Sequence, residues 1–485
     1  MSKSKVFTGV IWASIQRFGT MIISFVTNIV LARLLTPDDF GAIGMLMLFL
    51  AIANTFVDSG FGSALIQKKD ANQKDFSTVF FINLGMSVVV YALLFFGAPW
   101  VSRFYDLDLL RPLLRAQGLV LILHAFSIIQ TALLRKKMDF RKLSICNLLG
   151  NLVGSIVGIG AAFMGYGVWS LVIRTLTVGL VTSLLLWIIG KWKPLLVFSK
   201  QSFKELFGFG GFMLLSSIVT TLSNNVQTLI IGKLFSAKDL GNYNQAHNLR
   251  NLGTQSVSDV IAQVLYPDFS NNQTDSKQIT DKLNNAVYSI SYVVAAIMSL
   301  CVVIAKPLVL FLFGEKWLEC VVPFQILCCG GVFLSVQDIN YYVIAAKGKS
   351  KPLFFFNVAK LILSILMMFF GYKIGGLFGL LWSMVLISVI IYMIYCELAL
   401  HFLKAKRKQY VLLLKSIGLN IIIGVVCYLL LCILPDWPNI VLIILVAVAY
   451  LLLLVFVSYV LRMLPFFYLC NNFQNLIGNL RKRNR

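Results

Sequence analysis

Charged residues are scarce in this sequence, and acidic residues are the scarcest of them. Only 13% of the 485 residues are charged, 19 acidic against 42 basic, whereas 59% are hydrophobic. The mean hydropathy is +0.86. A soluble fold of this size could not bury so much apolar side chain, so lipid must be the solvent for much of the chain. The composition excludes a soluble globular protein.

The sequence also lacks the spacings that mark metal, redox and nucleotide sites. Its nine cysteines are scattered, mostly inside apolar runs, with no CxxC or Cys/His spacing and no phosphate-binding P-loop. The longest polar stretch, 271–282, is too short for a catalytic domain. We therefore expect no metal, no cofactor, no direct use of ATP and no catalytic residue. The dispersed His124, His247 and His401 are interpreted as packed or interfacial side chains.

Apolar runs long enough to cross a bilayer recur along the whole chain. An α-helix needs about 20 residues to span a hydrocarbon core of about 30 Å. The sequence therefore predicts an all-α polytopic membrane protein with fourteen transmembrane helices. The predicted spans are 9–33, 40–66, 78–104, 111–134, 143–163, 166–190, 206–234, 240–267, 284–313, 320–346, 352–372, 375–400, 411–434 and 439–464.

The net charge of +23 is placed in short basic clusters between these spans. Such clusters are typical of cytoplasmic loops that face anionic lipid, not of a nucleic-acid-binding face. The loops expected on the same side as the N-terminus contain most of the lysines and arginines, for example at 135–142 and 404–408, and so does the tail at 481–485. The loop at 164–167, on the opposite side, contains none. Both termini are therefore predicted to be cytoplasmic.

The first part of the chain is repeated in the second. VTNIVLARLLTPDDFG at 26–41 aligns with VQTLIIGKLFSAKDLG at 226–241. Six predicted helices separate the copies, so both insert in the same orientation as two parallel six-helix lobes. We expect an N-terminal lobe at 1–200, a C-terminal lobe at 201–405, accessory helices thirteen and fourteen at 406–465, and a basic cytoplasmic tail at 466–485.

A few charged residues fall inside predicted spans, where each costs at least ~2.5 kcal/mol on insertion scales. Such residues should face a wet cavity or one another, and pairing that only holds the bundle together is the alternative interpretation for each. The basic residues are candidates for substrate binding and the acidic residues for coupling to an ion. The basic set is Arg17, Arg174, Arg250 and Lys360, and the acidic set is Asp58, Asp259 and Asp338.

Uncharged polar side chains follow helical spacing on the same spans. Asn248, Asn251 and Gln255 share one face of span eight, Asn224 belongs to a similar stripe in span seven, and Asn28 lies in the matching part of span one. A hydrogen-bonded helix seam is the alternative, but such seams are usually shorter. We interpret these faces, with that of span two, as the walls of a central polar cavity between the lobes.

The cations in these walls indicate the charge of the ligand. Arg17 and Arg250 present a planar fork of donors that suits phosphate oxygens and stays charged when desolvated. An anionic head group such as a diphosphate is the expected ligand, while amide and hydroxyl side chains suit sugars.

The repeat and its neighbours also resemble a known family. LARLLTPDDFGAIGM at 31–45, FVDSGFGSALIQKKD at 56–70 and LFGEKWLECVVPFQILCCGG at 312–331 are similar to polysaccharide transporters of the multidrug/oligosaccharidyl-lipid/polysaccharide exporter superfamily, in particular to Wzx-type flippases of the colanic-acid-exporter branch. The resemblance extends over nearly the whole chain.

The resemblance implies two lobes that form a V, two additional helices, and a transporter rather than an enzyme. The implied substrate is undecaprenyl-diphosphate-linked oligosaccharide, carried from the cytoplasmic to the outer leaflet of the bacterial inner membrane by alternating access. A proton or sodium gradient or the membrane potential would drive it. The implied partners are membrane lipids, a polysaccharide polymerase and glycosyltransferases. Arg17 matches a cationic residue that family members commonly have in the first span.

Two alternatives stay open. An ion-coupled drug or small-molecule exporter of the same superfamily would need an acid-rich cavity and usually has twelve spans. A membrane-embedded glycan-processing enzyme would need a substantial outer loop with catalytic residues.

Overall fold

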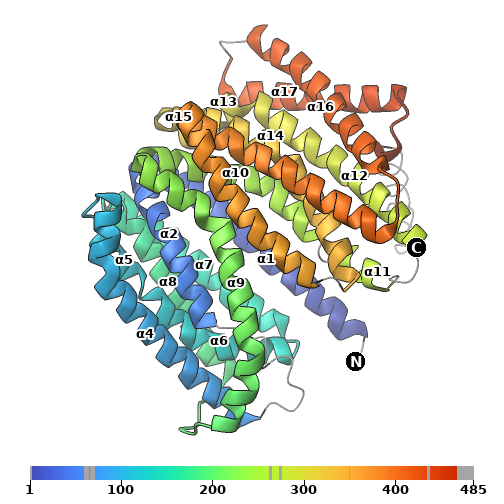
Figure 1. Ribbon diagram of the computed structural model, residues 1–485. Helices are drawn as coiled ribbons and strands as arrows, with labels where there is room; N and C mark the ends of the chain where they lie inside the picture. The colour runs from blue at the N-terminus through green and yellow to red at the C-terminus, as the bar shows by residue number, and fades with distance from the viewer. Residues whose placement is uncertain are drawn as a thin grey trace, which may run out of the picture. The chain divides into compact units, whose positions relative to one another are not determined.

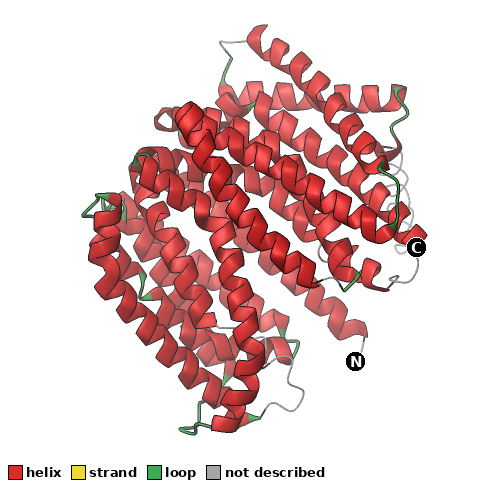
Figure 2. Ribbon diagram, in the orientation of Figure 1, coloured by secondary structure: helices red, strands yellow, loops and turns green. Residues whose placement is uncertain are grey.

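The computed structural model describes residues 3–58, 65, 72–260, 265–271, 276–348, 350–433 and 437–466, with side chains except at 3–7, 200–213, 255–260, 271, 350, 351 and 354. Regular structure in these ranges is helical throughout (Figure 2), which confirms the all-α prediction. The chain divides into two compact units, Met1–Asn244 and Gln245–Arg485. The lobe boundaries at residues 200 and 405 stay a prediction.

The N-terminal unit consists of membrane-length helices joined mostly by short turns (Figure 1). The predicted fourth span is broken near Gly118 into two helices, α5 and α6. Helix α10 (Ala237–Val260), which follows α9 in the chain, begins in this unit and ends in the other. The helices of the N-terminal unit are α1 (Lys3–Leu34), α2 (Pro37–Asp58), α4 (Gln73–Tyr105), α5 (Leu110–Gln117), α6 (Val120–Lys136), α7 (Phe140–Phe163), α8 (Trp169–Gly190) and α9 (Lys200–Leu234).

Small residues bring α7 and α8 into close contact. Gly150, Gly154 and Gly158 are spaced four residues apart on the face of α7 that meets α8. A Cβ atom at Gly158 would lie 2.6 Å from the Cβ of Arg174 on α8, so no larger residue fits. This small-xxx-small packing is typical of membrane helices, whose association depends on close van der Waals contact.

The two copies of the sequence repeat have the same local geometry. Thr36 donates from its hydroxyl to Asp39 Oδ2 at 2.8 Å before α2, and Ser236 donates to Asp239 Oδ2 at 2.6 Å before α10. Each pair is a helix N-cap in which a hydroxyl and a carboxylate bond to one another. The repeat is thus present in these turns, whereas the arrangement of two parallel six-helix lobes stays a prediction.

The C-terminal unit also consists of long helices. Its last helix, α17, is joined to α12 and to α16 by buried hydrogen bonds. Tyr292 and Ser458 bond through their hydroxyls at 2.7 Å, and Tyr450 donates to Asn420 Oδ1 at 2.8 Å. The helices are α11 (Tyr266–Asn271), α12 (Ser276–Val303), α13 (Ala305–Phe313), the 3₁₀ helix η2 (Glu315–Cys320), α14 (Val321–Ala346), α15 (Ser350–Leu403), α16 (Lys408–Ile433) and α17 (Asn439–Val460).

Helix α15 is two helices that fold back on one another. Gly375 and Gly376 have non-helical backbone angles, and Gly376 has φ 55°, a conformation that glycine adopts easily. A Cβ atom at Gly371 would meet the carbonyl group of Gly379. Residues eight apart in a continuous helix would be about 12 Å apart along the axis. The chain therefore reverses here, at the first residues of the predicted span 375–400.

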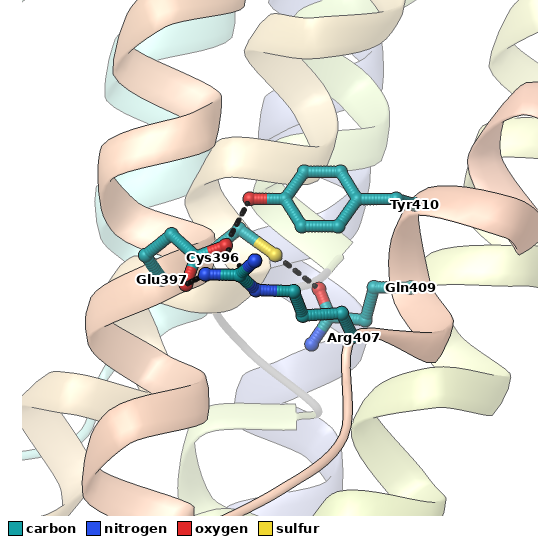
Figure 3. A network of polar contacts seen from close by, with 5 residues as sticks. All are labelled: Cys396, Glu397, Arg407, Gln409 and Tyr410. Atoms are coloured by element: carbon teal, nitrogen blue, oxygen red, sulfur yellow. Dashed lines mark hydrogen bonds and ion pairs between the residues drawn. The ribbon is translucent and has the colours of Figure 1, made fainter.

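A polar cluster closes the turn between α15 and α16 (Figure 3). The Arg407 guanidinium contacts both oxygens of Glu397, each at 3.1 Å, and Tyr410 donates to the same carboxylate at 3.0 Å. The Cys396 thiol donates to Gln409 Oε1 at 3.3 Å. These contacts fix the start of α16 against the end of α15 in the predicted cytoplasmic loop.

Twelve helices in the described ranges are long and apolar enough to cross a membrane, so the chain is a multi-pass membrane protein. They include α15 as one helix and omit α10, whose segment is rich in Asn, Gln and charge. Counting the two halves of α15 separately and adding α10 would give the fourteen spans predicted from the sequence. That number of spans stays a prediction.

Candidate functional site: a polar cavity in the N-terminal unit

Six helices of the N-terminal unit surround a cavity of about 560 Å³. Its walls come from α1, α2, α6, α7, α8 and α9, and most of the lining side chains are polar. Polar side chains inside a bundle of membrane helices are costly unless they face water, a ligand or one another. The lining residues are Gln16, Thr55, Asp58, His124, Ser127, Ile128, Thr131, Ala132, Arg135, Asn147, Asn151, Val178, Gly179, Thr182, Leu186, Leu214 and Ser217.

Helix α6 supplies the longest polar stripe. His124, Ser127, Thr131 and Arg135 follow one another at spacings of three or four residues, which places them on one face of the helix. The Ser127 hydroxyl donates to the backbone oxygen of His124 at 2.8 Å. His124 and Arg135 are exposed although they lie in a membrane-length helix, so their side chains project into open space.

Helix α7 adds two amides one turn apart. Asn147 donates from Nδ2 to the Leu143 carbonyl at 2.9 Å, and Asn151 donates to the Asn147 carbonyl at 3.0 Å. These bonds use an N–H of each amide on its own helix. The amide oxygens accept no hydrogen bond from a described residue, which leaves them available to hydroxyl donors of a ligand.

The charges of the cavity are of mixed sign. The Asp58 carboxylate, at the end of α2, is an electrostatic neighbour of His124 and Arg135. Asp58 is the only acidic residue among the described residues that line the cavity. One carboxylate beside an arginine and a histidine can hold a proton or a cation, and it leaves basic groups for an anion.

The predicted basic residues of the N-terminal unit lie close to this cavity but do not line it. Arg17 is an exposed residue of α1 directly after the lining residue Gln16. Arg174 lies on α8 one turn before the lining residue Val178, and its buried Nε has no hydrogen-bond partner among the described residues. Asn28 is half-buried on α1.

Helix α9 contributes some, but not all, of its predicted polar residues to the cavity. Ser217 lines the cavity, and Thr221, one turn later, bonds to Thr55 of α2 through their hydroxyls at 2.9 Å. The predicted Asn224 is exposed on the same helix and is not a lining residue.

In the C-terminal unit, Arg250 is oriented by its neighbours on α10. It is only 8% exposed and donates from Nε and Nη2 to Asn251 Oδ1 at 3.2 and 2.6 Å. Asn251 in turn bonds to His247 Nδ1 at 3.2 Å. Asn248 is exposed. The side chains of the predicted Gln255 and Asp259 lie outside the described residues.

The two remaining predicted charges lie close together. Asp338 on α14 is an electrostatic neighbour of Lys360 on α15. Beside them, Tyr395 donates to Asn357 Oδ1 at 2.9 Å. An acid and a base on neighbouring helices can stabilise helix packing or bind a ligand, and the cavity predicted between the two halves stays a prediction.

The structure also identifies cavity residues that the sequence interpretation missed. His124 was expected to be a packed or interfacial side chain, and Arg135 to be a loop residue, but both line the cavity. Their signal was the spacing 124, 127, 131 and 135, the same kind of stripe that marked span eight. Asn147 and Asn151 were missed in the same way.

The fold is shared with solved membrane transporters. A structure of lipid II flippase MurJ in an inward closed conformation superimposes with a TM-score of 0.75 at 15% identity, over 93% of this chain and 99% of the other. An inward-facing multidrug resistance MATE family transporter of the MOP superfamily gives a TM-score of 0.65 at 15% identity, over 82% of this chain and 98% of the other. The chain therefore belongs, by fold, to the class of polytopic helical membrane proteins that includes these transporters.

Sequence comparison defines the family within this class. The chain is 26% identical to the teichuronic acid biosynthesis protein TuaB of Bacillus subtilis (strain 168), over 84% of each chain. It is also 26% identical to the lipopolysaccharide biosynthesis protein WzxC of Escherichia coli (strain K12), over 80% of this chain and 79% of the relative. Residues 30–322, more than half of the chain, match the family described as polysaccharide biosynthesis protein. The chain is a member of that family, as its resemblance to polysaccharide transporters implied.

Proposed function

We propose that this protein is a flippase that moves an undecaprenyl-diphosphate-linked oligosaccharide from the cytoplasmic to the outer leaflet of the bacterial inner membrane. The observation that carries the proposal is a polar cavity inside membrane-length helices of a polysaccharide biosynthesis protein. Relatives with the names lipopolysaccharide biosynthesis protein WzxC and succinoglycan biosynthesis transport protein ExoT (Rhizobium meliloti, strain 1021; 26% identical over 63% of this chain) support it.

The chemistry of the cavity suits the head group of such a substrate. Asn147, Asn151 and Thr182 offer the neutral acceptors and donors that sugar hydroxyls need. Arg135 supplies positive charge for phosphate oxygens, and His124 adds ring nitrogens that can form hydrogen bonds. The polyprenyl chain would stay in lipid, because transfer of its apolar surface into a polar cavity is unfavourable.

The position of Arg135 indicates from which side of the membrane the substrate would enter the cavity. Arg135 lies in the last turn of α6 and begins the basic segment 135–142 that the sequence places in the cytoplasm. Asp58, at the end of α2, lies at the same end of the unit. The cavity then occupies the cytoplasmic half of the membrane, where a substrate assembled inside the cell would bind first. Both termini are cytoplasmic in this proposal.

The remaining predicted residues complete the proposed path. Arg17 and Arg250 hold the diphosphate as it leaves the cavity, and Arg174 and Lys360 add positive charge. Arg250 is suited to this role because Asn251 fixes its guanidinium in one orientation. The proposed sugar contacts along the path are Asn28, Asn224, Asn248, Asn251 and Gln255.

The membrane potential or an ion gradient drives the cycle in this proposal. Each elementary charge that crosses is worth about 2.3 kcal/mol per 100 mV. A head group of charge about minus two that leaves an inside-negative cell gains ~4–5 kcal/mol per 100 mV. Asp58 is the preferred site for a coupling proton or sodium ion because it lines the cavity. Asp259 and Asp338 are the other candidates, and lobe rocking between two access states completes the cycle.

The proposed partner enzymes follow from the nature of the substrate. Glycosyltransferases on the cytoplasmic side build the lipid-linked oligosaccharide, and a polymerase on the outer side uses it. The protein itself acts as a transporter and not as an enzyme.

The test is translocation by the purified full-length protein in proteoliposomes. A polyprenyl-diphosphate-linked oligosaccharide is supplied in one leaflet, and its exposure in the other is followed with an added glycosidase. We expect protein-dependent exposure that Arg135→Gln reduces and that Arg141→Gln, which removes an arginine outside the cavity, leaves unchanged. Failure of the wild-type protein to translocate the lipid, together with ion-driven efflux of a cationic dye, would instead support a drug exporter.

A further inference from the structure

A second pocket lies on the N-terminal unit, away from the polar cavity. It has a volume of about 480 Å³ and is formed by α4 and α5 with the first residue before α6. None of its lining residues is shared with the polar cavity. They are Tyr91, Phe95, Arg111, Pro112, Arg115, Ala116 and Leu119. The pocket thus combines two arginines with mostly apolar walls.

A proline in α4 fixes the position of Arg115. Pro99 has no N–H, so the carbonyl of Phe95, four residues earlier, cannot form its usual helical hydrogen bond. Arg115 Nε donates to this carbonyl at 3.1 Å, and its guanidinium carbon lies 4.2 Å from the centroid of the Phe95 ring. The backbone oxygen and the ring use Nε and one face of the guanidinium. The two Nη groups make no hydrogen bond to a described residue and are held at the pocket.

Arg111 adds a second positive charge one helical turn away. The side chains at positions 111 and 115 of α5 lie on the same face of the helix, because residues four apart are neighbours. The opposite face of α5, with Leu110, Leu113 and Leu114, is buried. This short amphipathic helix therefore directs its basic face away from the protein core.

No acidic residue lines this pocket within the described part of the chain. The acids nearest in sequence, Asp106 and Asp108, contact other groups. Asp106 Oδ2 lies 3.6 Å from Lys233 Nζ, and Asp108 accepts from the Ser102 hydroxyl at 3.4 Å. The positive charge of the pocket is therefore not neutralised by a lining carboxylate.

The neighbouring surface is suited to lipid. Phe96 and Trp100 on α4 are each 72% exposed, and Leu93 is 68% exposed. Large apolar side chains on a membrane-length helix face the acyl chains, and tryptophan is enriched at the membrane–water interface. A molecule bound between Arg111, Arg115 and the aromatic walls would have its anionic group beside the arginines and its chains along α4.

We propose that the pocket between α4 and α5 binds the phosphate head group of an anionic glycerophospholipid such as phosphatidylglycerol. Arg111 and Arg115 contact the phosphate, and Tyr91, Phe95 and Leu119 contact the glycerol and first acyl carbons. The topology prediction places this site opposite to the basic cytoplasmic loops, where arginines are otherwise few. This lipid site is independent of the translocation path.

Native mass spectrometry of the full-length protein tests the proposal. The protein is titrated in detergent with phosphatidylglycerol, with phosphatidylcholine and, separately, with inorganic phosphate. We expect a tight phosphatidylglycerol adduct whose affinity exceeds that for phosphatidylcholine. Arg111→Gln should lower the affinity about fivefold, since a basic residue near an anionic lipid surface contributes about that factor. Arg111→Lys should retain most of it.

Arg103→Gln is the matched control. Arg103 is an exposed residue in the last turn of α4 and does not line the pocket. Its change to Gln removes the same charge as Arg111→Gln. Equal weakening by Arg103→Gln and Arg111→Gln would overturn the proposal in favour of general surface charge. Equal affinity for the two lipids would overturn it as well, and so would competitive displacement of the lipid by millimolar inorganic phosphate.

Arg115→Gln is a second variant, in which the Phe95 carbonyl also loses its donor. Its thermal unfolding is therefore measured beside its lipid affinity. Weaker binding without a lower unfolding temperature supports the assignment of Arg115. Unchanged binding in both Arg111→Gln and Arg115→Gln contradicts the site.

Discussion

The two units each contain a large pocket, and the pockets differ in how their polar groups are used. The cavity of the N-terminal unit, about 560 Å³, is lined mostly by polar side chains. The groove of the C-terminal unit, about 430 Å³ between α12, α14 and α16, is lined mainly by apolar side chains such as Val302, Val332 and Phe333. Both are built from membrane-length helices.

The polar groups of the C-terminal groove are used for helix packing. Ser299 donates to the backbone oxygen of Asn420 at 2.8 Å, and Gln325 donates to the Val302 carbonyl at 3.1 Å. Asn420 also accepts from Tyr450. In the N-terminal cavity, by contrast, the oxygens of Asn147 and Asn151 have no partner among the described residues. A polar residue in a membrane helix therefore indicates a ligand site only where its neighbours leave its hydrogen-bonding groups available.

The largest effect is expected from charge reversal in the N-terminal cavity. Arg135→Glu should reduce translocation about 100-fold or more, because the change replaces a cation that attracts the diphosphate with an anion that repels it. The unfolding temperature should change little, since Arg135 is exposed. The rate is measured in proteoliposomes, with Arg141→Glu as the control. An equal loss of translocation in Arg141→Glu would mean that the position of the charge in the cavity does not matter.

The second largest effect is expected on stability in the C-terminal unit. Asn420→Leu should lower the free energy of unfolding by about 1–3 kcal/mol, because it leaves the buried Tyr450 hydroxyl without an acceptor. Translocation per folded molecule should stay close to wild type. Unfolding in detergent measures the first quantity and the proteoliposome assay the second.

A double variant sharpens that result. Asn420→Leu with Tyr450→Phe removes both partners and should recover part of the lost stability, as expected for two directly coupled residues. Additive losses would contradict a direct contact. A transport defect larger than the stability defect would mean that the C-terminal groove also has a transport role.

The smallest effect is expected from the hydroxyl bond between Thr55 of α2 and Thr221 of α9. Thr55→Val removes the bond to Thr221 but retains the shape of the side chain, and should cost about 0.6 kcal/mol, the average for such bonds between membrane helices. Thr221→Val should cost the same, and the double variant no more than either. Thr55 also lines the cavity, so a translocation loss confined to Thr55→Val would assign it a ligand contact.

Much of the helical framework could be predicted from the sequence. The predicted spans 143–163 and 439–464 correspond to α7 (Phe140–Phe163) and α17 (Asn439–Val460). The break between spans 352–372 and 375–400 was predicted within a few residues of the reversal at Gly375 and Gly376. The alignment paired Asp39 with Asp239, and the structure places both in equivalent turns. These features depend on hydropathy and on a few local bonds, both of which are properties of neighbouring residues in the chain.

The site could be predicted only in part. Asp58 was selected for its charge in a span and does line the cavity. Arg135 was assigned to a loop because it begins a basic cluster, yet it lies in the last turn of α6 and faces the cavity. Arg174 was selected for its charge, but its own helix could not show that the glycines of α7 pack against it.

The sequence by itself determined that the chain is a helical membrane protein, where most of its helices begin and end, and which family it resembles. Apolar length, caps and motifs are local, so they can be read along the chain. Only the tertiary structure decided which polar residues share a cavity and which are consumed in helix seams. That outcome depends on the side chain that an adjacent helix places opposite each residue. For this reason His124 lines a cavity, whereas Asn420 bonds to neighbouring helices.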